Sequence, residues 1–181
     1  MHLLQLSCSS STFIFQHDTP HNMSTRDTFY GWYFAIHFVI TLMVDGGFAI
    51  PAAYKLPGQQ FMEDFHVASN KDFIVLEKPA WFMSFIWIEI LFQLPFFVYG
   101  AYKLLTKTAT PTTYLWMLVY GVNASLTTLA CLAEVWARAG LTDALRYNLL
   151  AVYAPFFFIS GYIVIDVFQR LQGELRKVKT D

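Results

Sequence analysis

The chain has 181 residues, of which 56% are hydrophobic and only 14% are charged, and its formal net charge is −1. A soluble domain carries about 25% charged residues, so this chain has too few charged side chains to cover a globular surface. The balanced charge offers no basic surface for nucleic acid, and the length fits one domain. We therefore expect a single-domain membrane protein.

The first residues differ from the rest of the chain. Residues 1–22 are rich in serine, and their short apolar patch at Phe13–Phe15 is too short for the core of a signal peptide. We expect residues 1–25 to be a disordered leader or a gene-model extension. A membrane domain at 26–172 and a basic cytosolic tail at 173–181 would follow.

Four segments are apolar enough to cross a membrane. Stretches with few or no charged residues place them near residues 29–50, 81–105, 114–135 and 147–168. A helix needs about 20 mostly apolar residues to cross the hydrocarbon, and lipid offers no partners for the backbone groups of an open strand. The sequence therefore predicts an all-α, polytopic membrane protein, built as a four-transmembrane-helix bundle surrounded by membrane lipids.

An even number of spans puts both termini on one side of the membrane. That side holds seven of the 12 lysine and arginine residues, which favours cytosolic termini because cytosolic flanks carry more basic residues. Lys179 and Lys177 are third and fifth from the C-terminus, which matches a dilysine retrieval signal read in the cytosol. We expect an endoplasmic reticulum membrane protein, with an ordinary basic flank as the alternative explanation of the two lysines.

The longest connection, residues 51–79, joins the first two spans. It begins with Pro51, Pro57 and Gly58 and continues with hydrophobic residues among charged ones. A structureless loop of this length is uncommon in a compact domain. We expect the segment to fold over the mouth of the bundle as a lid.

Two carboxylates, Asp45 and Glu89, lie within the predicted spans. Each costs about 2.5–3.5 kcal/mol near the centre of a membrane helix, and such residues usually face the bundle interior and mark a site. At 1.5 Å per residue, Asp45 lies about 9 Å and Glu89 about 6 Å from the midplane, both on the lumenal side. We expect the two groups to meet, to share a proton, and to bind a cationic amine or a hydroxyl group.

Other polar side chains fall in the same half of the bundle. His37 and Thr41 precede Asp45 at intervals of four residues, which places all three on one face of a helix. The other three spans contribute Gln93, Thr128 and Tyr153. Packing against neighbouring helices is the alternative role for Thr41 and His37. Pro95 and Pro155 interrupt two helices, and the carbonyl groups that a proline frees often line cavities.

No catalytic or metal-binding motif accompanies these residues. The sequence has no glycine-rich phosphate loop and no serine–histidine–aspartate set, and its five histidines do not cluster as metal ligands. We expect no catalytic residues, no metal and no cofactor. Glu134 and Asp166 lie near the ends of spans and are expected at the membrane interface.

The second span carries a long and specific resemblance. Residues 79–85, PAWFMSF, and residues 89–97, EILFQLPFF, resemble the second span of the sigma-2 receptor (sigma intracellular receptor 2) group in the EXPERA-domain family. Shorter similarities lie at residues 40–45, ITLMVD, and 152–155, VYAP. The family also includes a fungal protein described as efficient mitochondria targeting-associated and, more distantly, the sterol Δ8–Δ7 isomerase.

This resemblance implies a four-helix fold with a ligand cavity that opens toward the membrane, residence in the endoplasmic reticulum and often a homodimer. By motif position, Asp45 is the charge partner of the ligand and Glu89 is a protonated acid bonded to it. Asp72 falls where the family has a structural acid of the lumenal loop. Further cavity positions are held by His37, Gln93, Thr128, Tyr153 and Phe156. At the last of these, sigma-2 receptors have a tyrosine.

Three functions stay open from the sequence. The first is a non-enzymatic membrane protein that binds sterols or cationic amphiphiles through Asp45 and Glu89. It would act in sterol or lipid homeostasis or in protein traffic, with sterol-transport or protein-targeting partners. The second is a factor at the surface of the endoplasmic reticulum that assists targeting of mitochondrial precursor proteins. The third is a sterol isomerase-like enzyme, because paired acids suit general acid/base catalysis.

Overall fold

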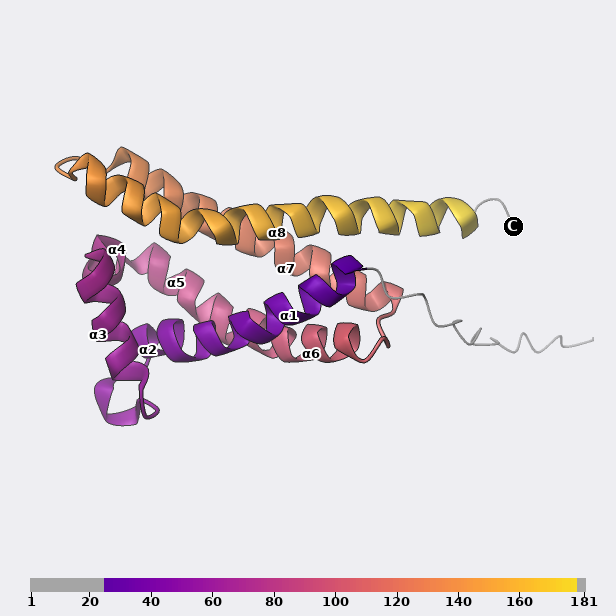
Figure 1. Ribbon diagram of the computed structural model, residues 1–181, viewed down its shortest axis with the longest axis horizontal. Coiled ribbons are helices and arrows are strands. Elements are labelled where there is room, and N and C mark those ends of the chain that lie inside the picture. Colours follow the sequence, from indigo (N-terminus) through magenta and orange to yellow (C-terminus); the bar gives the residue numbers. More distant parts are fainter. Residues whose placement is uncertain (1–24, 179–181) are drawn as a thin grey trace, which may run out of the picture.

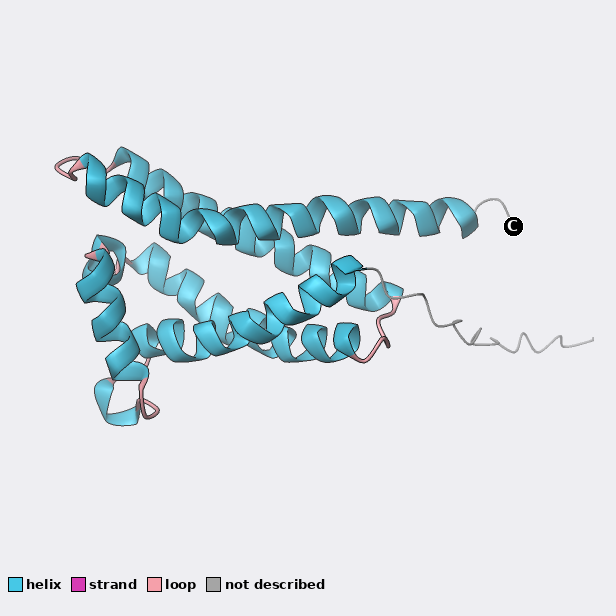
Figure 2. Ribbon diagram, in the orientation of Figure 1, coloured by secondary structure: helices cyan, strands magenta, loops and turns pink. Residues whose placement is uncertain are grey.

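The structure is a computed structural model that describes residues 25–178 (Figure 1). Every regular element in that range is a helix or a helical turn (Figure 2). Four helices long and apolar enough to cross a membrane cover Thr25–Ala49, Ala80–Leu105, Pro111–Ala137 and Asp143–Arg176. The predicted all-α, four-helix membrane architecture is confirmed, and each predicted span overlaps one of these helices.

The first two long helices each contain one π-helical turn. The first consists of α1 (Thr25–Ile40), the π turn η1 (Thr41–Asp45) and α2 (Gly46–Ala49), and the second of α5 (Ala80–Ile88), the π turn η3 (Glu89–Gln93) and α6 (Leu94–Leu105). Pro95 accounts for the second turn, because it has no N–H and its ring clashes with the carbonyl four residues earlier. The chain inserts one residue there, and the Leu94 N–H bonds to Glu89 O, five residues back.

The other two long helices are α7 (Pro111–Ala137) and α8 (Asp143–Val178). α7 begins at a capping box, in which the Thr110 and Thr113 hydroxyls each accept a hydrogen bond from the backbone N–H of the other residue. Pro111 occupies the first helical position, where its missing N–H leaves no bond unmade. α8 continues through Pro155.

The long helices form two pairs. α1 packs against α6, and α7 packs along α8 (Figure 1). α7 and α8 approach closely at Gly121, where a Cβ atom would lie 2.9 Å from Val164 Cγ2 and 3.1 Å from the backbone oxygen of Ser160. Small residues at such contacts let membrane helices gain dispersion energy through close packing.

Aromatic side chains fill the end of the bundle where α1 begins. The ring of Phe34 lies 5.1, 5.9 and 5.3 Å from the rings of Phe96, Phe97 and Tyr120. All four side chains are buried. Aromatic pairs in these arrangements contribute about 0.5–1.5 kcal/mol each beyond the area they bury. This half of the bundle is densely packed with aromatic rings, and the cavity described below lies toward the other end.

A buried ion-pair network joins α1 to α8 at the same end. Arg170 lies 2.5 Å from Asp27 and 2.7 Å from Asp166. Tyr30 and Tyr114 donate hydrogen bonds of 2.9 and 3.0 Å to Asp166 and Asp27 respectively. Asp166, which the sequence placed near a span end, is only 3% exposed, and its partners are Arg170 of the same helix and Arg26 and Tyr30 of α1.

Residues 51–79 form a helical lid at the opposite end of the bundle. They contain the 3₁₀ turn η2 (Ala52–Tyr54), α3 (Gln59–Asn70) and α4 (Phe73–Glu77). α3 runs across the long helices (Figure 1) and contacts α2, η1 and α8. Lys78 donates a 3.0 Å hydrogen bond to Phe48 O, and an ion pair joins Arg138 to Glu77. The segment is folded, as the sequence led us to expect.

Some predictions fall outside the described part of the chain. They are the leader up to residue 24 and the side chains of Lys177 and Lys179. The division into leader, membrane domain and tail therefore stays a prediction.

Gly121→Ala tests the close approach of α7 and α8. Its methyl group would meet a backbone oxygen that moves only if α8 moves, so we expect a loss of about 1–3 kcal/mol of stability, measured as a lower melting temperature in detergent. Gly161→Ala on the facing helix is the matched control, because a Cβ atom there would meet Ser125 Oγ at 4.0 Å, an ordinary contact. Equal melting temperatures for the two variants would contradict this packing.

Candidate functional site

A cavity of about 230 Å³ lies between the helix pairs and the lid. All four long helices and the lid contribute to its wall, which is largely apolar and aromatic. Side chains with a polar group on the wall are Tyr33, His37, Asp45, His66, Glu89, Gln93, Tyr120, Thr127, Thr128 and Tyr153. No lysine or arginine occurs among the described residues that line it.

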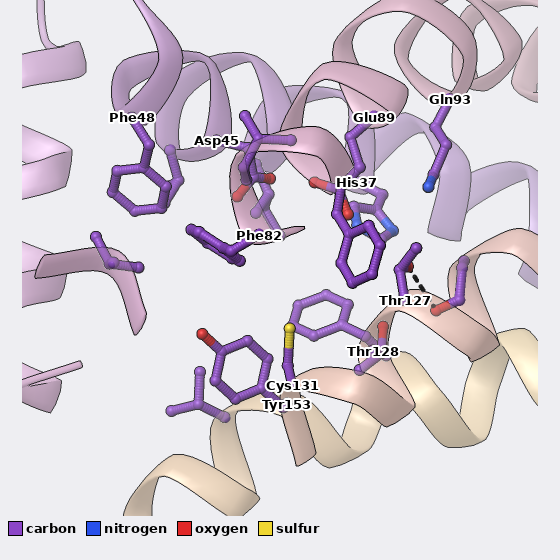
Figure 3. A pocket seen from close by; sticks show the side chains of 18 of the residues that line it. His37, Asp45, Phe48, Phe82, Glu89, Gln93, Thr127, Thr128, Cys131 and Tyr153 are labelled. Atoms are coloured by element: carbon purple, nitrogen blue, oxygen red, sulfur yellow. Dashed lines mark hydrogen bonds between the residues drawn. The ribbon is translucent and has the colours of Figure 1, made fainter. Parts of the chain in front are cut away.

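The carboxyl groups of Asp45 and Glu89 point toward one another on one side of the cavity (Figure 3). The two groups interact electrostatically, and the π turns that carry them pack against each other. If the two carboxyl groups share one proton, the pair carries one negative charge. Such a pair offers a ligand both an anionic acceptor and a neutral acid.

Each acid lies at the edge of a π turn. Asp45 is the last residue of η1 and Glu89 is the first residue of η3. Such turns are uncommon inside α-helices and are frequent at functional sites. Because one residue corresponds to about 100° of rotation, each turn changes which side chains of its helix face the cavity.

His37 lies on the cavity wall among aromatic rings. Its ring stacks on Phe97 at 4.7 Å and lies 5.1 Å from the rings of both Phe156 and Tyr33. Its Nδ1 atom is buried and has no hydrogen-bond partner in the described part of the chain. A buried polar atom left unpaired costs about 1–3 kcal/mol, so a polar group of a ligand that reached His37 would be stabilised.

Several polar groups on or beside the cavity wall are hydrogen-bonded within the bundle. Gln93 Nε2 donates to Asn123 Oδ1 at 2.9 Å, and the hydroxyls of Tyr33 and Tyr120 lie 3.0 Å apart. The Thr127 hydroxyl donates to Ala124 O at 3.2 Å (Figure 3). These bonds hold the wall in a fixed shape around the acids.

Asp72 joins the lid to α8 and is completely buried. As the N-cap of α4, it accepts a 3.0 Å hydrogen bond from the Ile74 N–H. It also accepts a 2.6 Å hydrogen bond from the Tyr153 hydroxyl and lies 3.3 Å from His66 Nε2. One carboxylate thus bonds a lid helix to a spanning helix, which supports the structural role expected for it.

The structure brings together most of the residues that the sequence singled out as ligand-binding. Those on the cavity wall are His37, Asp45, Glu89, Gln93, Thr128, Tyr153 and Phe156. Thr41 is different: it is 1% exposed and does not line the cavity. The four-residue spacing assumed an unbroken α-helix, whereas a π turn begins at Thr41 and changes its alignment with Asp45. Pro95 follows η3, and Pro155 lies within α8. Their roles in binding stay predictions.

Several further wall residues, among them Tyr33, His66 and Tyr120, were not identified from the sequence. Tyr33 lies four residues before His37, so the same helical spacing could have indicated it. His66 lies seven residues after Gln59, and the two share the inner face of α3. If residues 59–70 had been predicted as a helix, this spacing would have identified both Gln59 and His66.

The sequence of this chain is similar to a known protein family and to several known proteins. Residues 57–167 match the model of EXPERA, the expanded EBP superfamily. Efficient mitochondria targeting-associated protein 19 of Saccharomyces cerevisiae is 35% identical over 72% of this chain and 90% of its own length. The Schizosaccharomyces pombe protein of the same name is 29% identical over 85% and 81%. Sigma intracellular receptor 2 of Homo sapiens is 30% identical over 75% and 82%.

Tyr153→Phe tests the bond between α8 and the lid. A hydrogen bond to a charged group contributes about 1.5–3 kcal/mol, so the lid should open about 10 to 150 times more often. In a Cys8→Ser background, maleimide labelling of the buried Cys131 on the cavity wall reports this opening. Tyr147→Phe, at an exposed position of the same helix, is the control and should label at the parental rate. If Tyr153→Phe also kept that rate, the bond would not hold the lid.

Proposed function

The chain belongs to the EXPERA (expanded EBP) superfamily, and from this premise we propose that it binds a sterol or a cationic amphiphile in its intramembrane cavity. Asp45 and Glu89 would hold the polar group of the ligand, and the aromatic walls would hold its apolar body. The protein would be a multi-pass resident of the endoplasmic reticulum membrane, active in sterol or lipid homeostasis or in protein traffic.

One observation carries the proposal. Two carboxyl groups meet in an apolar cavity whose described lining contains no lysine or arginine. An uncompensated charge at this depth is costly, since charged groups in low-dielectric surroundings require a partner. A cationic amine would supply that partner, and its hydrocarbon portion would fill the space between the aromatic rings. A sterol hydroxyl would instead bond to the shared-proton form of the pair.

The relatives support the same class of function. A sigma intracellular receptor 2 is by its name a receptor, and its similarity to this chain extends over 82% of the human protein. The similarity therefore covers the membrane bundle and its cavity rather than one short motif. Asp45, Glu89 and His37 are the residues that we assign to the ligand, with Gln93, Thr128, Tyr153 and Phe156 shaping the rest of the site.

Two other functions compete with this one. The fungal relatives are named for efficient targeting to mitochondria, which favours a factor that assists precursor proteins at the surface of the endoplasmic reticulum. Normal precursor import after deletion of the gene, together with altered sterol handling, would count against that role. The acid pair beside the unpaired Nδ1 of His37 favours a sterol isomerase-like enzyme, which any isomerised product from a Δ8-sterol would support.

Asp45→Asn should abolish the charge pairing and keep the shape of the side chain. Charge-assisted hydrogen bonds contribute about 1.5–3 kcal/mol, so we expect about a 10- to 150-fold loss of affinity for a radiolabelled cationic amphiphile. Binding is measured on the purified full chain in lipid nanodiscs. Parental affinity in this variant would show that Asp45 is not the counter-ion.

Asp64→Asn is the matched control for that experiment. This variant makes the same change from aspartate to asparagine on the exposed face of α3. There the Asp64 carboxylate accepts a 2.8 Å hydrogen bond from Gln60. Its replacement should leave amphiphile binding unchanged. A similar loss in both variants would indicate a general effect of charge on uptake by the nanodisc.

The basic tail gives a separate test of location. Replacing Lys177 and Lys179 with serine should release the protein from the endoplasmic reticulum to later compartments, because the dilysine receptor reads both positions. Fluorescence microscopy of the full chain with an N-terminal tag measures this, and replacing Lys103 and Lys107 provides the control. Unchanged retention would assign the location to another part of the chain.

A further inference from the structure

The π turn η1 determines the direction in which Asp45 points. Its Gly46 N–H bonds to Thr41 O, five residues back, so the turn contains one residue more than an α-helix would. In an unbroken α-helix, Asp45 would lie about 80° around the axis from His37, whereas the extra residue reduces the offset to about 20°. Both side chains consequently line the same cavity.

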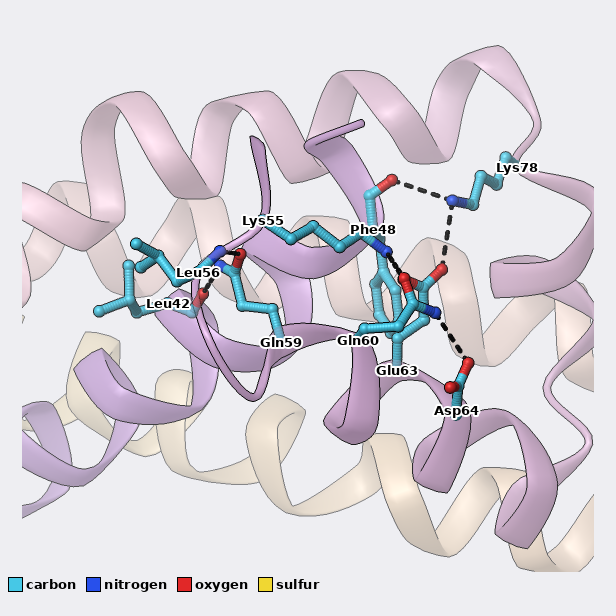
Figure 4. Close-up of polar contacts among 9 residues, drawn as sticks. All are labelled: Leu42, Phe48, Lys55, Leu56, Gln59, Gln60, Glu63, Asp64 and Lys78. Carbon is cyan, nitrogen blue, oxygen red and sulfur yellow. Dashed lines mark hydrogen bonds and ion pairs between the residues drawn. The ribbon is translucent and has the colours of Figure 1, made fainter. Parts of the chain in front are cut away.

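The extra residue leaves one carbonyl without its α-helical donor. In an α-helix the Gly46 N–H would bond to Leu42 O, and here it bonds to Thr41 O instead. The lid supplies the replacement: Gln59 Nε2 donates to Leu42 O at 2.7 Å (Figure 4). Gln59 Oε1 in turn accepts the Leu56 N–H at 2.7 Å, and the Gln59 side chain is 0% exposed.

The two glycines after Asp45 make room for this contact. A Cβ atom on Gly46 would lie 3.0 Å from Gln59 Nε2, and one on Gly47 would lie 3.4 Å from the Gln59 backbone oxygen. Any other residue at position 46 would crowd the amide against the turn that it bonds. The glycines, the π turn and Gln59 therefore form one unit that connects the lid to the ligand site.

We propose that Gln59 is a positioning residue, which holds η1 in its π form and so directs the Asp45 carboxylate to the ligand. The inference rests on the function proposed above, since it concerns the same acid pair. Without the amide, Leu42 O regains its bond from Gly46 only if η1 returns to α-helix, which turns Asp45 away from the cavity. By linkage, a cation held by Asp45 stabilises the Gln59 contact and the closed lid, whereas an uncharged ligand does so less.

Gln59→Met tests the proposal, because methionine keeps the length of the side chain and removes both hydrogen bonds. We expect about a tenfold weaker binding of a radiolabelled cationic amphiphile and little change for its uncharged analogue with carbon in place of nitrogen, both measured on the full chain in nanodiscs. Gln60→Met, the same change at the neighbouring exposed position, should bind both probes like the parent. An equal loss for both probes would mean that Gln59 only supports the fold and would overturn the proposal.

The Asp45→Asn background separates this inference from the proposed function. With the charge gone, Gln59→Met should cause no further loss of amine binding, and a further tenfold loss would overturn the inference. If Asp45→Asn weakens binding while Gln59→Met does not, the inference alone fails. If Asp45→Asn itself binds normally, both fail. Gly46→Ala, which displaces the amide without changing Gln59, should reproduce the loss for the amine, and parental binding in that variant would contradict the positioning role.

Discussion

The meeting of two carboxyl groups inside an apolar membrane bundle is the constraint on which the other features depend. A charged group near the bilayer centre costs a few kcal/mol even when neighbours and water relax around it. Both carboxyl groups lie in one half of the bundle. The aromatic cluster around Phe34 fills the other half, and the cavity occupies the half that holds the acids. The lid covers the end of the cavity, and the hydrogen bond from Tyr153 to Asp72 joins the lid to α8. The packing asymmetry and the lid both place Asp45 and Glu89 on the wall of an internal cavity.

Much of this architecture could be read from the sequence. The four spans could be predicted because long stretches with few charged residues indicate helices that lie in the hydrocarbon of the membrane. The similar depth of Asp45 and Glu89 followed from the positions of the spans alone. The second-span motif carried the family resemblance. The lid was expected because its length and mixed polarity do not fit an unstructured loop, although its helices were not placed.

The features that could not be predicted depend on contacts between distant segments, and the spacing of residues along the sequence does not reveal such contacts. Helical periodicity assumes a constant number of residues per turn, so it could not predict the π turn at residues 41–45 or the resulting alignment of Thr41 with Asp45. The proline at position 95 was a usable signal for the second π turn, but the first has no proline and is supported by Gln59 from another element. The burial of Asp166 likewise involves Arg26 and Tyr30, which only the folded bundle brings to it.

The length of α8 has a consequence for the end of the bundle where α1 begins. Its 36 residues extend about 54 Å, far more than the roughly 30 Å of hydrocarbon that a span must cover. Arg170 forms an ion pair with Asp27. The part of α8 from Arg170 to Val178 extends about 12 Å beyond this ion pair. The C-terminal part of α8 therefore projects beyond the ends of the other long helices as a single helical extension (Figure 1).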